Sequence, residues 1–165
     1  MDEPSRTDLL VSLAEIAVAL LGFAAIVSVF RGRDGGWRPE GRFWVMVTLG
    51  FSNFVLALLP IPFLAATARS SVTWEICSAL LALVAVGNAI LAVRVYGIDR
   101  DSGMSYSHFF QVCYLVVLAG AATFGVANTG LFFETQFWPY VAALVLLQVA
   151  TASTFLRLLF VWLAR

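Results

Sequence analysis

The sequence predicts an all-α fold, a polytopic membrane protein built as a bundle of five transmembrane helices. The first observation is the composition: 61% of the 165 residues are hydrophobic and 12% are charged, against about 45–50% and about 25% in soluble domains. With so few charged side chains, a soluble monomer could not cover its surface. The second observation is that the apolar residues gather in five segments, each long enough for the roughly 20 residues that cross a bilayer as a helix.

The predicted spans are joined by short connections. The longest of these, Arg31–Arg42 and Gly97–His108, hold twelve residues each, which is too few to bury a core of their own. We therefore expect residues 1–165 to form a single transmembrane domain. The five predicted spans are Leu9–Phe30, Phe43–Ala66, Trp74–Tyr96, Phe109–Phe133 and Phe137–Leu163.

The arginines predict the orientation, because the cytoplasmic loops of membrane proteins are enriched in basic residues. All ten basic residues are arginine. If five helices alternate in direction, Arg6 and Arg69 lie on one side and the other eight lie on the opposite side. This distribution predicts an N-terminus outside the cell and a C-terminus in the cytoplasm. The eight arginines on the predicted cytoplasmic side are Arg31, Arg33, Arg38, Arg42, Arg94, Arg100, Arg157 and Arg165.

The first predicted helix carries a resemblance to known proteins. It contains Ser12-Leu13-Ala14-Glu15-Ile16-Ala17, then Gly22-Phe23, and it ends in Phe30-Arg31-Gly32-Arg33. This short stretch resembles the start of small bacterial multi-pass membrane proteins to which no activity is assigned. The resemblance implies a location in the bacterial inner (cell) membrane, and it implies no site residue.

Residues that carry chemistry in enzymes and nucleic-acid-binding proteins are scarce in this chain. The formal net charge of zero argues against a nucleic acid partner. There is no lysine, the one histidine (His108) lies outside the predicted spans, and Cys77 and Cys113 lie at different depths, too far apart for a disulfide. No spacing of His, Cys, Asp or Glu is typical of a metal site. We therefore expect no enzymatic activity, no metal and no cofactor.

Glu15 is the sharpest candidate for a functional residue, because a charged side chain within a span is costly unless it faces protein or water. At about 100° per residue, it shares one helix face with residues that are acidic or polar toward the N-terminus, small in the middle and apolar beyond. In a symmetric oligomer, this acidic stripe would place a ring of carboxylates along a cation or proton path. The acidic stripe consists of Asp8, Ser12, Glu15, Ala19, Gly22 and Ile26.

Two classes of function remain open from the sequence. The first is a homo-oligomeric cation or proton channel, or a transporter-like pore, lined by the first helix. The second is a non-catalytic membrane scaffold or accessory subunit that binds a partner or lipid through its helices. In that case Glu15 is structural, and it is either protonated or bonded to a neighbouring helix through Ser78 or Thr123. The partners we expect are membrane lipids and further copies of the chain, and a membrane-protein partner stays open.

Further polar residues lie within the predicted spans. In-span amides commonly form hydrogen bonds between helices, and packing is the role we expect for them. Pro60 and Pro62 lack backbone donors and predict a kink or unwinding at the outer end of the second span. Unwound backbone in a membrane needs protein or water beside it, so this region is a second candidate for a permeation path. The in-span amides singled out here are Asn53, Asn88, Asn128 and Gln148.

Small residues follow a helical spacing in the third and fourth spans, and such stripes are typical of close helix contacts in membranes. The contacts lie either within one bundle or between copies of the chain. We expect a homo-oligomer with the third or fourth helix at the contact between copies, near Ala85 or Gly125. The third span carries Ser78, Ala82, Ala85, Ala89 and Ala92, and the fourth carries Ala121, Gly125 and Thr129.

Overall fold

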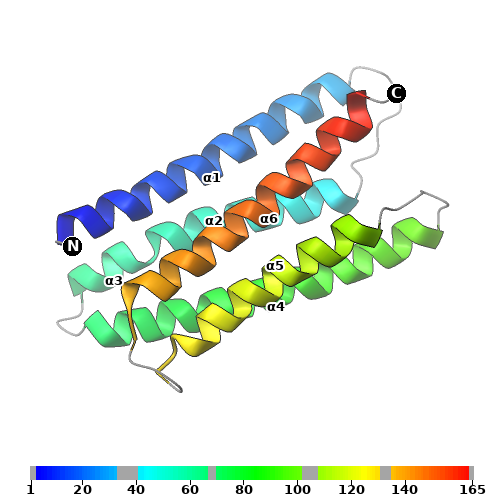
Figure 1. Cartoon of the computed structure of the whole chain (residues 1–165). Helices are drawn as coiled ribbons and strands as arrows, with labels where there is room; N and C mark the ends of the chain where they lie inside the picture. The colour runs from blue at the N-terminus through cyan, green and yellow to red at the C-terminus, as the bar shows by residue number, and fades with distance from the viewer. Residues whose placement is uncertain (1–2, 33–40, 67–69, 102–107, 131–134, 164–165) are drawn as a thin grey trace.

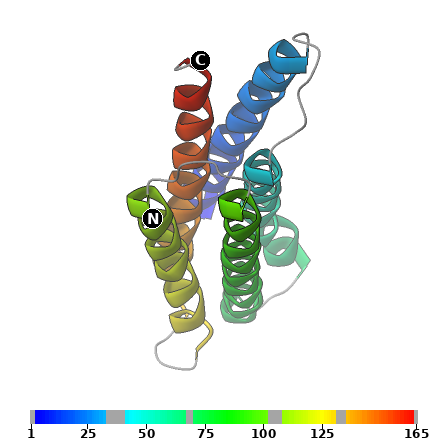
Figure 2. The ribbon, with the colours of Figure 1, turned by 90° about the vertical axis from the view of Figure 1, so that its right-hand side faces the viewer.

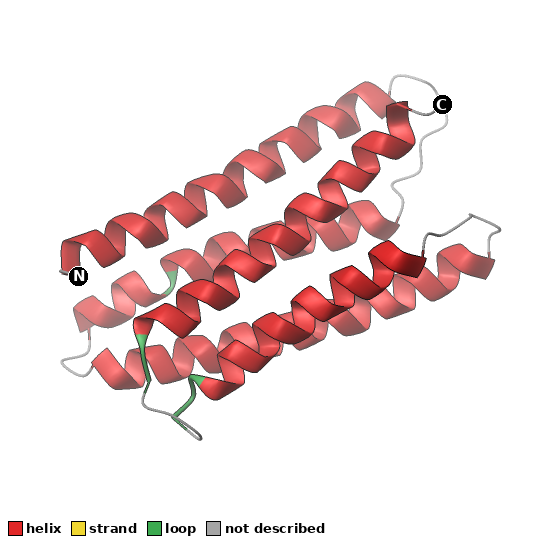
Figure 3. Ribbon diagram, viewed as in Figure 1, coloured by secondary structure: helices red, strands yellow, loops and turns green. Residues whose placement is uncertain are grey.

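The structure is a computed structural model that describes residues 3–32, 41–66, 70–101, 108–130 and 135–163. These residues form helices joined by short turns, without any strand in the described ranges (Figure 3). The fold is therefore all-helical, as predicted. The helices are α1 Glu3–Gly32, α2 Gly41–Leu58, α3 Pro60–Ala66, α4 Ser70–Asp101, α5 His108–Ala127 and α6 Phe137–Leu163.

Four helical segments are long and apolar enough to cross a membrane, which is compatible with the predicted membrane protein. They are Ser5–Val27, Phe43–Ala65, Ser71–Val95 and Phe137–Arg157. The apolar part of α5, Gln111–Ala127, is shorter. The count of five spans and their orientation therefore stay predictions.

The helices run roughly along one axis, and consecutive helices alternate in direction, with α2 and α3 together forming one broken rod (Figures 1 and 2). The chain's N-terminus and the first residues of α4 and α6 lie at the same end, which we call the N-terminal end of the bundle (Figure 1). Helix α6 is central, since it contacts α1, α2, α4 and α5. Helix α1 is peripheral and packs against α2 and α6.

The break between α2 and α3 confirms the kink predicted from the prolines. In an α-helix, the N–H of residue 60 would bind the carbonyl of residue 56, but Pro60 has no N–H. The Leu56 carbonyl instead accepts a hydrogen bond from the hydroxyl of Tyr140 on α6. The proline thus frees a backbone acceptor inside the bundle, and a tyrosine from another helix satisfies it.

Aromatic residues at the N-terminal end are buried between helices. The ring of Trp74 on α4 lies 5.7 Å from that of Tyr140 and 5.4 Å from that of Phe137, centroid to centroid. Trp74 is 4% exposed and Tyr140 is fully buried, whereas Trp138 is 57% exposed. In the structure, Trp74 and Tyr140 hold α4 and α6 together.

The small-residue stripes of α4 and α5 face each other within one chain. A Cβ built on Gly125 would lie 2.9 Å from the backbone oxygen of Ser78 and 3.0 Å from the Cβ of Ala82. Ala85 and Ala121 are fully buried. The prediction that Ala85 or Gly125 lies at a contact between copies is therefore wrong, because both are covered inside the bundle.

The fourth predicted span, Phe109–Phe133, also ends too late. Helix α5 ends at Ala127, and Gly130 has a φ of 80°, a backbone conformation that glycine adopts readily. The cause is Asn128: its Oδ1 accepts the backbone N–H of Gln136 at 2.8 Å, and its Nδ2 donates to the Gln136 carbonyl at 2.8 Å. This amide links the end of α5 to the residue before α6, so that the chain turns here. Residues 131–134 lie outside the described residues.

Tyr140→Phe is expected to lower the free energy of unfolding by about 1–3 kcal/mol, because it leaves the Leu56 carbonyl buried without a partner. Pro60→Ala restores an N–H at residue 60, so Tyr140→Phe should cost clearly less in that background. A double-mutant cycle measured by denaturant titration in detergent checks this coupling. Additive effects of the two substitutions would contradict the role given to Tyr140.

Gly125→Ala is expected to destabilise the protein by about 1–3 kcal/mol, because the added methyl group would overlap the backbone of α4. Gly87→Ala is the matched control, since nothing lies within 4 Å of a Cβ at Gly87. The control should be neutral or stabilising by up to about 1 kcal/mol, through better helix propensity. Thermal unfolding of both variants checks the pair, and equal shifts would refute the close contact between α4 and α5.

Candidate functional site on the first helix

The acidic stripe lies on the outer surface of the bundle. Helix α1 turns a narrow apolar face inward, on which Leu10, Leu13, Ala14 and Ala17 are buried. The structure brings the predicted stripe residues together on one continuous outward face. Each of them is exposed: Asp8, Ser12, Glu15, Ala19, Gly22 and Ile26.

A hydrogen bond from α6 helps to set the rotation of α1. The Nε2 of Gln148 donates to the backbone oxygen of Leu13 at 2.6 Å. Glu15 lies two residues further along α1, about 200° around the helix axis. A contact that holds Leu13 against α6 therefore turns Glu15 away from the core.

Glu15 has no hydrogen-bond or ion-pair partner within the described ranges, and the structure does not bring it to Ser78 or Thr123. The hydroxyl of Ser78 accepts a hydrogen bond from Asn128 at 2.8 Å, and that of Thr123 donates to the Ala119 carbonyl of its own helix at 2.8 Å. These residues lie on α4 and α5, whereas α1 packs on α2 and α6. An exposed carboxylate ten residues into the span that begins at Ser5 lies about 15 Å along the helix.

Such a carboxylate is costly against lipid, by about 2.5–3.5 kcal/mol for an acid at the centre of a span. Cover by protein or water would remove this cost. The outward face of α1 is thus a candidate surface for contact with another protein chain or with water.

A second in-span carboxylate, Glu75, is missing from the sequence prediction. It lies on α4 next to Trp74 and is half-buried, with its Oε1 3.5 Å from where a Cβ on Gly130 would lie. The sequence could have indicated this residue, since Glu75 is an acidic residue within the third predicted span. Glu75 faces the turn after α5 and is separate from the acidic stripe.

The in-span amides differ in their partners. Asn128 makes the hydrogen bonds to Ser78 and Gln136 already described, and Gln148 reaches α1. The Nδ2 of Asn88 donates to the Val84 carbonyl of its own helix at 2.9 Å. Asn53 is fully buried, and neither its Nδ2 nor its Oδ1 has a hydrogen-bond partner in the part of the chain that the structure describes.

Asn53 and Gln148 occupy the same helix interface. A Cβ built on Gly50 of α2 would lie 3.5 Å from the Cγ2 of Thr151 on α6, and these two helices are antiparallel (Figure 1). Asn53 follows Gly50 by three residues and Gln148 precedes Thr151 by three, so both lie in the next turn. The Oε1 of Gln148 is also unpaired among the described residues. Asn53 and Gln148 thus form a buried polar layer inside a bundle whose core is otherwise mostly apolar.

The described ranges contain no group of three or more His, Cys, Asp or Glu residues that could hold a metal ion. Cys77 is buried and Cys113 is exposed, and both are free thiols. Comparisons of the chain with protein-family models, with curated proteins and with solved structures find no match.

Substitution by leucine should have opposite effects at the two asparagines. Asn128→Leu is expected to lower the free energy of unfolding by about 1–3 kcal/mol, because Ser78 and the Gln136 backbone lose a buried partner. Asn53→Leu is expected to raise it by up to about 2 kcal/mol, because it removes an unpaired buried amide. Thermal unfolding of both variants in one detergent checks the signs. A loss of stability in Asn53→Leu would show that this amide has a partner.

Proposed function

We propose that the protein is a non-catalytic integral membrane protein of five spans that assembles with further copies of itself through α1, and that it passes a cation or a proton along the acidic stripe. The observation that supports this proposal is the position of Glu15, an exposed in-span carboxylate on the least buried of the four candidate spans. In the apolar stretch of α1, 28% of the residues are buried, against 50% in that of α6.

The interior of a single bundle offers a poor path for ions. The residues where α2, α4 and α6 meet are large and apolar, including Leu49, Leu56, Leu81 and Leu144, each at most 3% exposed. The buried amides of Asn53 and Gln148 lie within this packed region. A path that uses the stripe must therefore run between copies of the chain.

The order of residues along the stripe suits a cation path that can close. Asp8 and Glu15 supply negative charge toward the N-terminal end, and rings of carboxylates select cations. Ala19 and Gly22 leave a wide section in the middle. Ile26 is 53% exposed, and a ring of such apolar side chains can gate a pore by dewetting.

The sequence supports an orientation and a location for the protein. The arginine distribution supports an N-terminus outside the cell and a C-terminus in the cytoplasm. The resemblance of the first helix to bacterial multi-pass proteins supports the inner membrane, with lipids around the remaining outer faces.

The second candidate function is that of a scaffold or accessory subunit whose α1 packs against another membrane protein. The observation that favours it is the shape of the stripe near Gly22, where nothing lies within 4 Å of an added Cβ. Small residues that leave such a notch let a second helix approach closely. In this case, a polar group of the partner would satisfy Glu15.

The test is cation and proton flux into liposomes that contain the purified protein. Glu15→Gln keeps the shape of the side chain and removes its charge, and it should lower the flux about tenfold, since charged linings raise local ion concentration by about 10–10³. Glu75→Gln is the matched control, an in-span carboxylate away from the stripe, and it should leave the flux within about twofold.

Two results would contradict the proposal that the protein forms a pore. One is a wild-type protein that conducts no cation or proton between about pH 5 and pH 8, and the other is equal flux in wild type and Glu15→Gln. Mass measurement in mild detergent separates the remaining readings. An assembly of copies without flux supports the scaffold, and a single 18.0 kDa chain refutes self-assembly.

A further inference from the structure

Arg6 is a cation without a carboxylate partner in the part of the chain that the structure describes. It lies near the start of α1, at the N-terminal end of the bundle, and it is half-buried. The central carbon of its guanidinium lies 5.4 Å from the ring centroid of Phe137 on α6. Its Nε is buried and has no hydrogen-bond partner among the described residues. Such a group needs an acceptor, and the described side chains supply none there.

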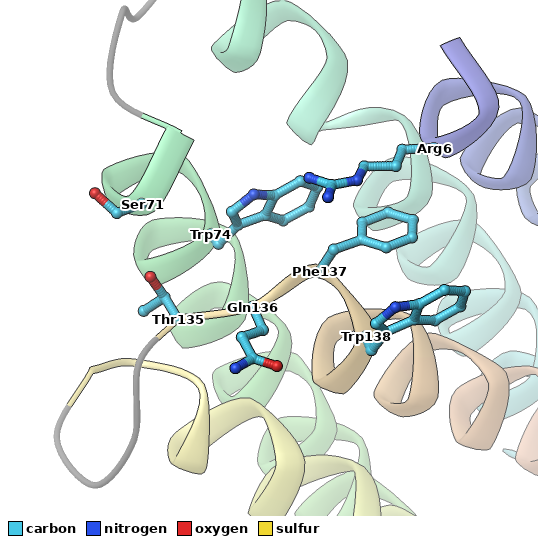
Figure 4. A pocket seen from close by; sticks show the side chains of 7 residues that line it. All are labelled: Arg6, Ser71, Trp74, Thr135, Gln136, Phe137 and Trp138. Atoms are coloured by element: carbon cyan, nitrogen blue, oxygen red, sulfur yellow. The ribbon is translucent and has the colours of Figure 1, made fainter. Parts of the chain in front are cut away.

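A pocket of about 290 Å³ opens beside this guanidinium (Figure 4). It lies between the first turns of α1, α4 and α6. Most of its lining residues carry a side-chain hydrogen-bond donor: Ser71, Thr135, Gln136, Trp74 and Trp138. None of the described lining residues is acidic. The lining thus combines one fixed positive charge with neutral donors.

The helix directions add to this positive character. Helices α1, α4 and α6 all begin at this end (Figure 1), and a helix N-terminus carries partial positive charge and free N–H groups. The described carboxylates on these helices point elsewhere. Glu75 lies beside Gly130, and Asp8 is exposed on the acidic stripe, about 200° around α1 from Arg6.

We propose that this pocket binds a phosphate group, supplied either by the headgroup of a membrane lipid or by a free phosphate. Guanidinium is planar, stays charged at every physiological pH and binds phosphate through paired N–H donors. A volume of 290 Å³ exceeds the roughly 30 Å³ of one water molecule and leaves room for a phosphate group with part of a headgroup. This site is independent of the acidic stripe and of the function proposed for it.

A cationic ligand does not suit the same pocket. Aromatic side chains can bind quaternary ammonium groups over their ring faces, and Trp74, Phe137 and Trp138 are all present. Here, however, Arg6 already lies over the ring of Phe137 and would repel a second cation. The ring of Phe137 instead holds the guanidinium in place for an anion.

The test uses the full-length protein in a maltoside detergent, which contains no phosphate. It is titrated with dihexanoyl phosphatidic acid, with inorganic phosphate and with dihexanoylglycerol, which has the same acyl chains and no phosphate. Binding is read from tryptophan fluorescence and from the shift in melting temperature. The wild type is expected to respond saturably to phosphatidic acid and not to dihexanoylglycerol.

Arg6→Gln should weaken this binding at least about tenfold, equivalent to about 1.4 kcal/mol. Arg94→Gln is the matched control, an exposed arginine on α4 near the opposite end, and it should change the affinity less than about twofold. Arg6→Lys keeps the charge and loses the planar donors, and it should weaken binding about threefold or more. It serves as the decisive variant if Arg6→Gln does not fold.

Each outcome bears on the proposal. A response to both phosphate probes supports a site that also takes free phosphate, and a response to phosphatidic acid alone supports a lipid headgroup. Three results would overturn it: no response to either phosphate probe, an equal response to dihexanoylglycerol, or unchanged affinity in the Arg6 variants.

Discussion

The hydrogen bond from Tyr140 to the Leu56 carbonyl is the interaction on which the centre of the bundle depends. In apolar surroundings, a backbone carbonyl without a partner is costly, and Pro60 creates one by removing the donor that would continue α2. The tyrosine that satisfies it comes from α6, the helix that contacts α1, α2, α4 and α5. The Trp74 ring packs beside Tyr140. One proline thus ties the break in the second helix to the position of the central helix.

Other polar groups also differ in whether the chain supplies a hydrogen-bond or ion-pair partner. Asn128 finds all its partners within the chain, and its role is to end α5 and to direct the turn into α6. Glu15 and Arg6 find no such partner in the ranges that the structure describes. A polar group that the fold satisfies explains structure, whereas one that the fold leaves unpaired at its surface indicates a component outside the chain. This distinction carries both proposals for this protein.

Much of this fold is predictable from the sequence, because length, apolar composition and proline positions act locally. The start of the last helix at Phe137 and the break at Pro60 both follow from such signals. The inward faces are not predictable in the same way, since lipid is as apolar as a protein core. Leu83 is 68% exposed while Ser78, on the same helix, is fully buried. Close approach to α5 decides this arrangement, and it depends on the partner helix.

The candidate sites show the same limit. The acidic stripe could be predicted, because helical spacing alone places Asp8, Glu15 and Gly22 on one face. The pocket at Arg6 could not be predicted, because its lining comes from α1, from the start of α4 and from the residues that lead into α6, far apart in the sequence. Glu75 was visible as an in-span acid, yet its place beside Gly130 depends on how the turn after α5 folds.

The two candidate sites are linked through the rotation of α1. Arg6 and Leu13 are seven residues apart and lie within about 20° of each other on the helix surface. Arg6 rests on Phe137 and Leu13 accepts the hydrogen bond from Gln148, and both contacts are with α6. Glu15 is nine residues from Arg6, about 180° around the helix. The contacts that hold α1 to the bundle therefore turn the carboxylate outward. Since α1 is the least buried of the candidate spans, these two polar contacts matter more for its orientation than they would for a helix fixed by extensive packing.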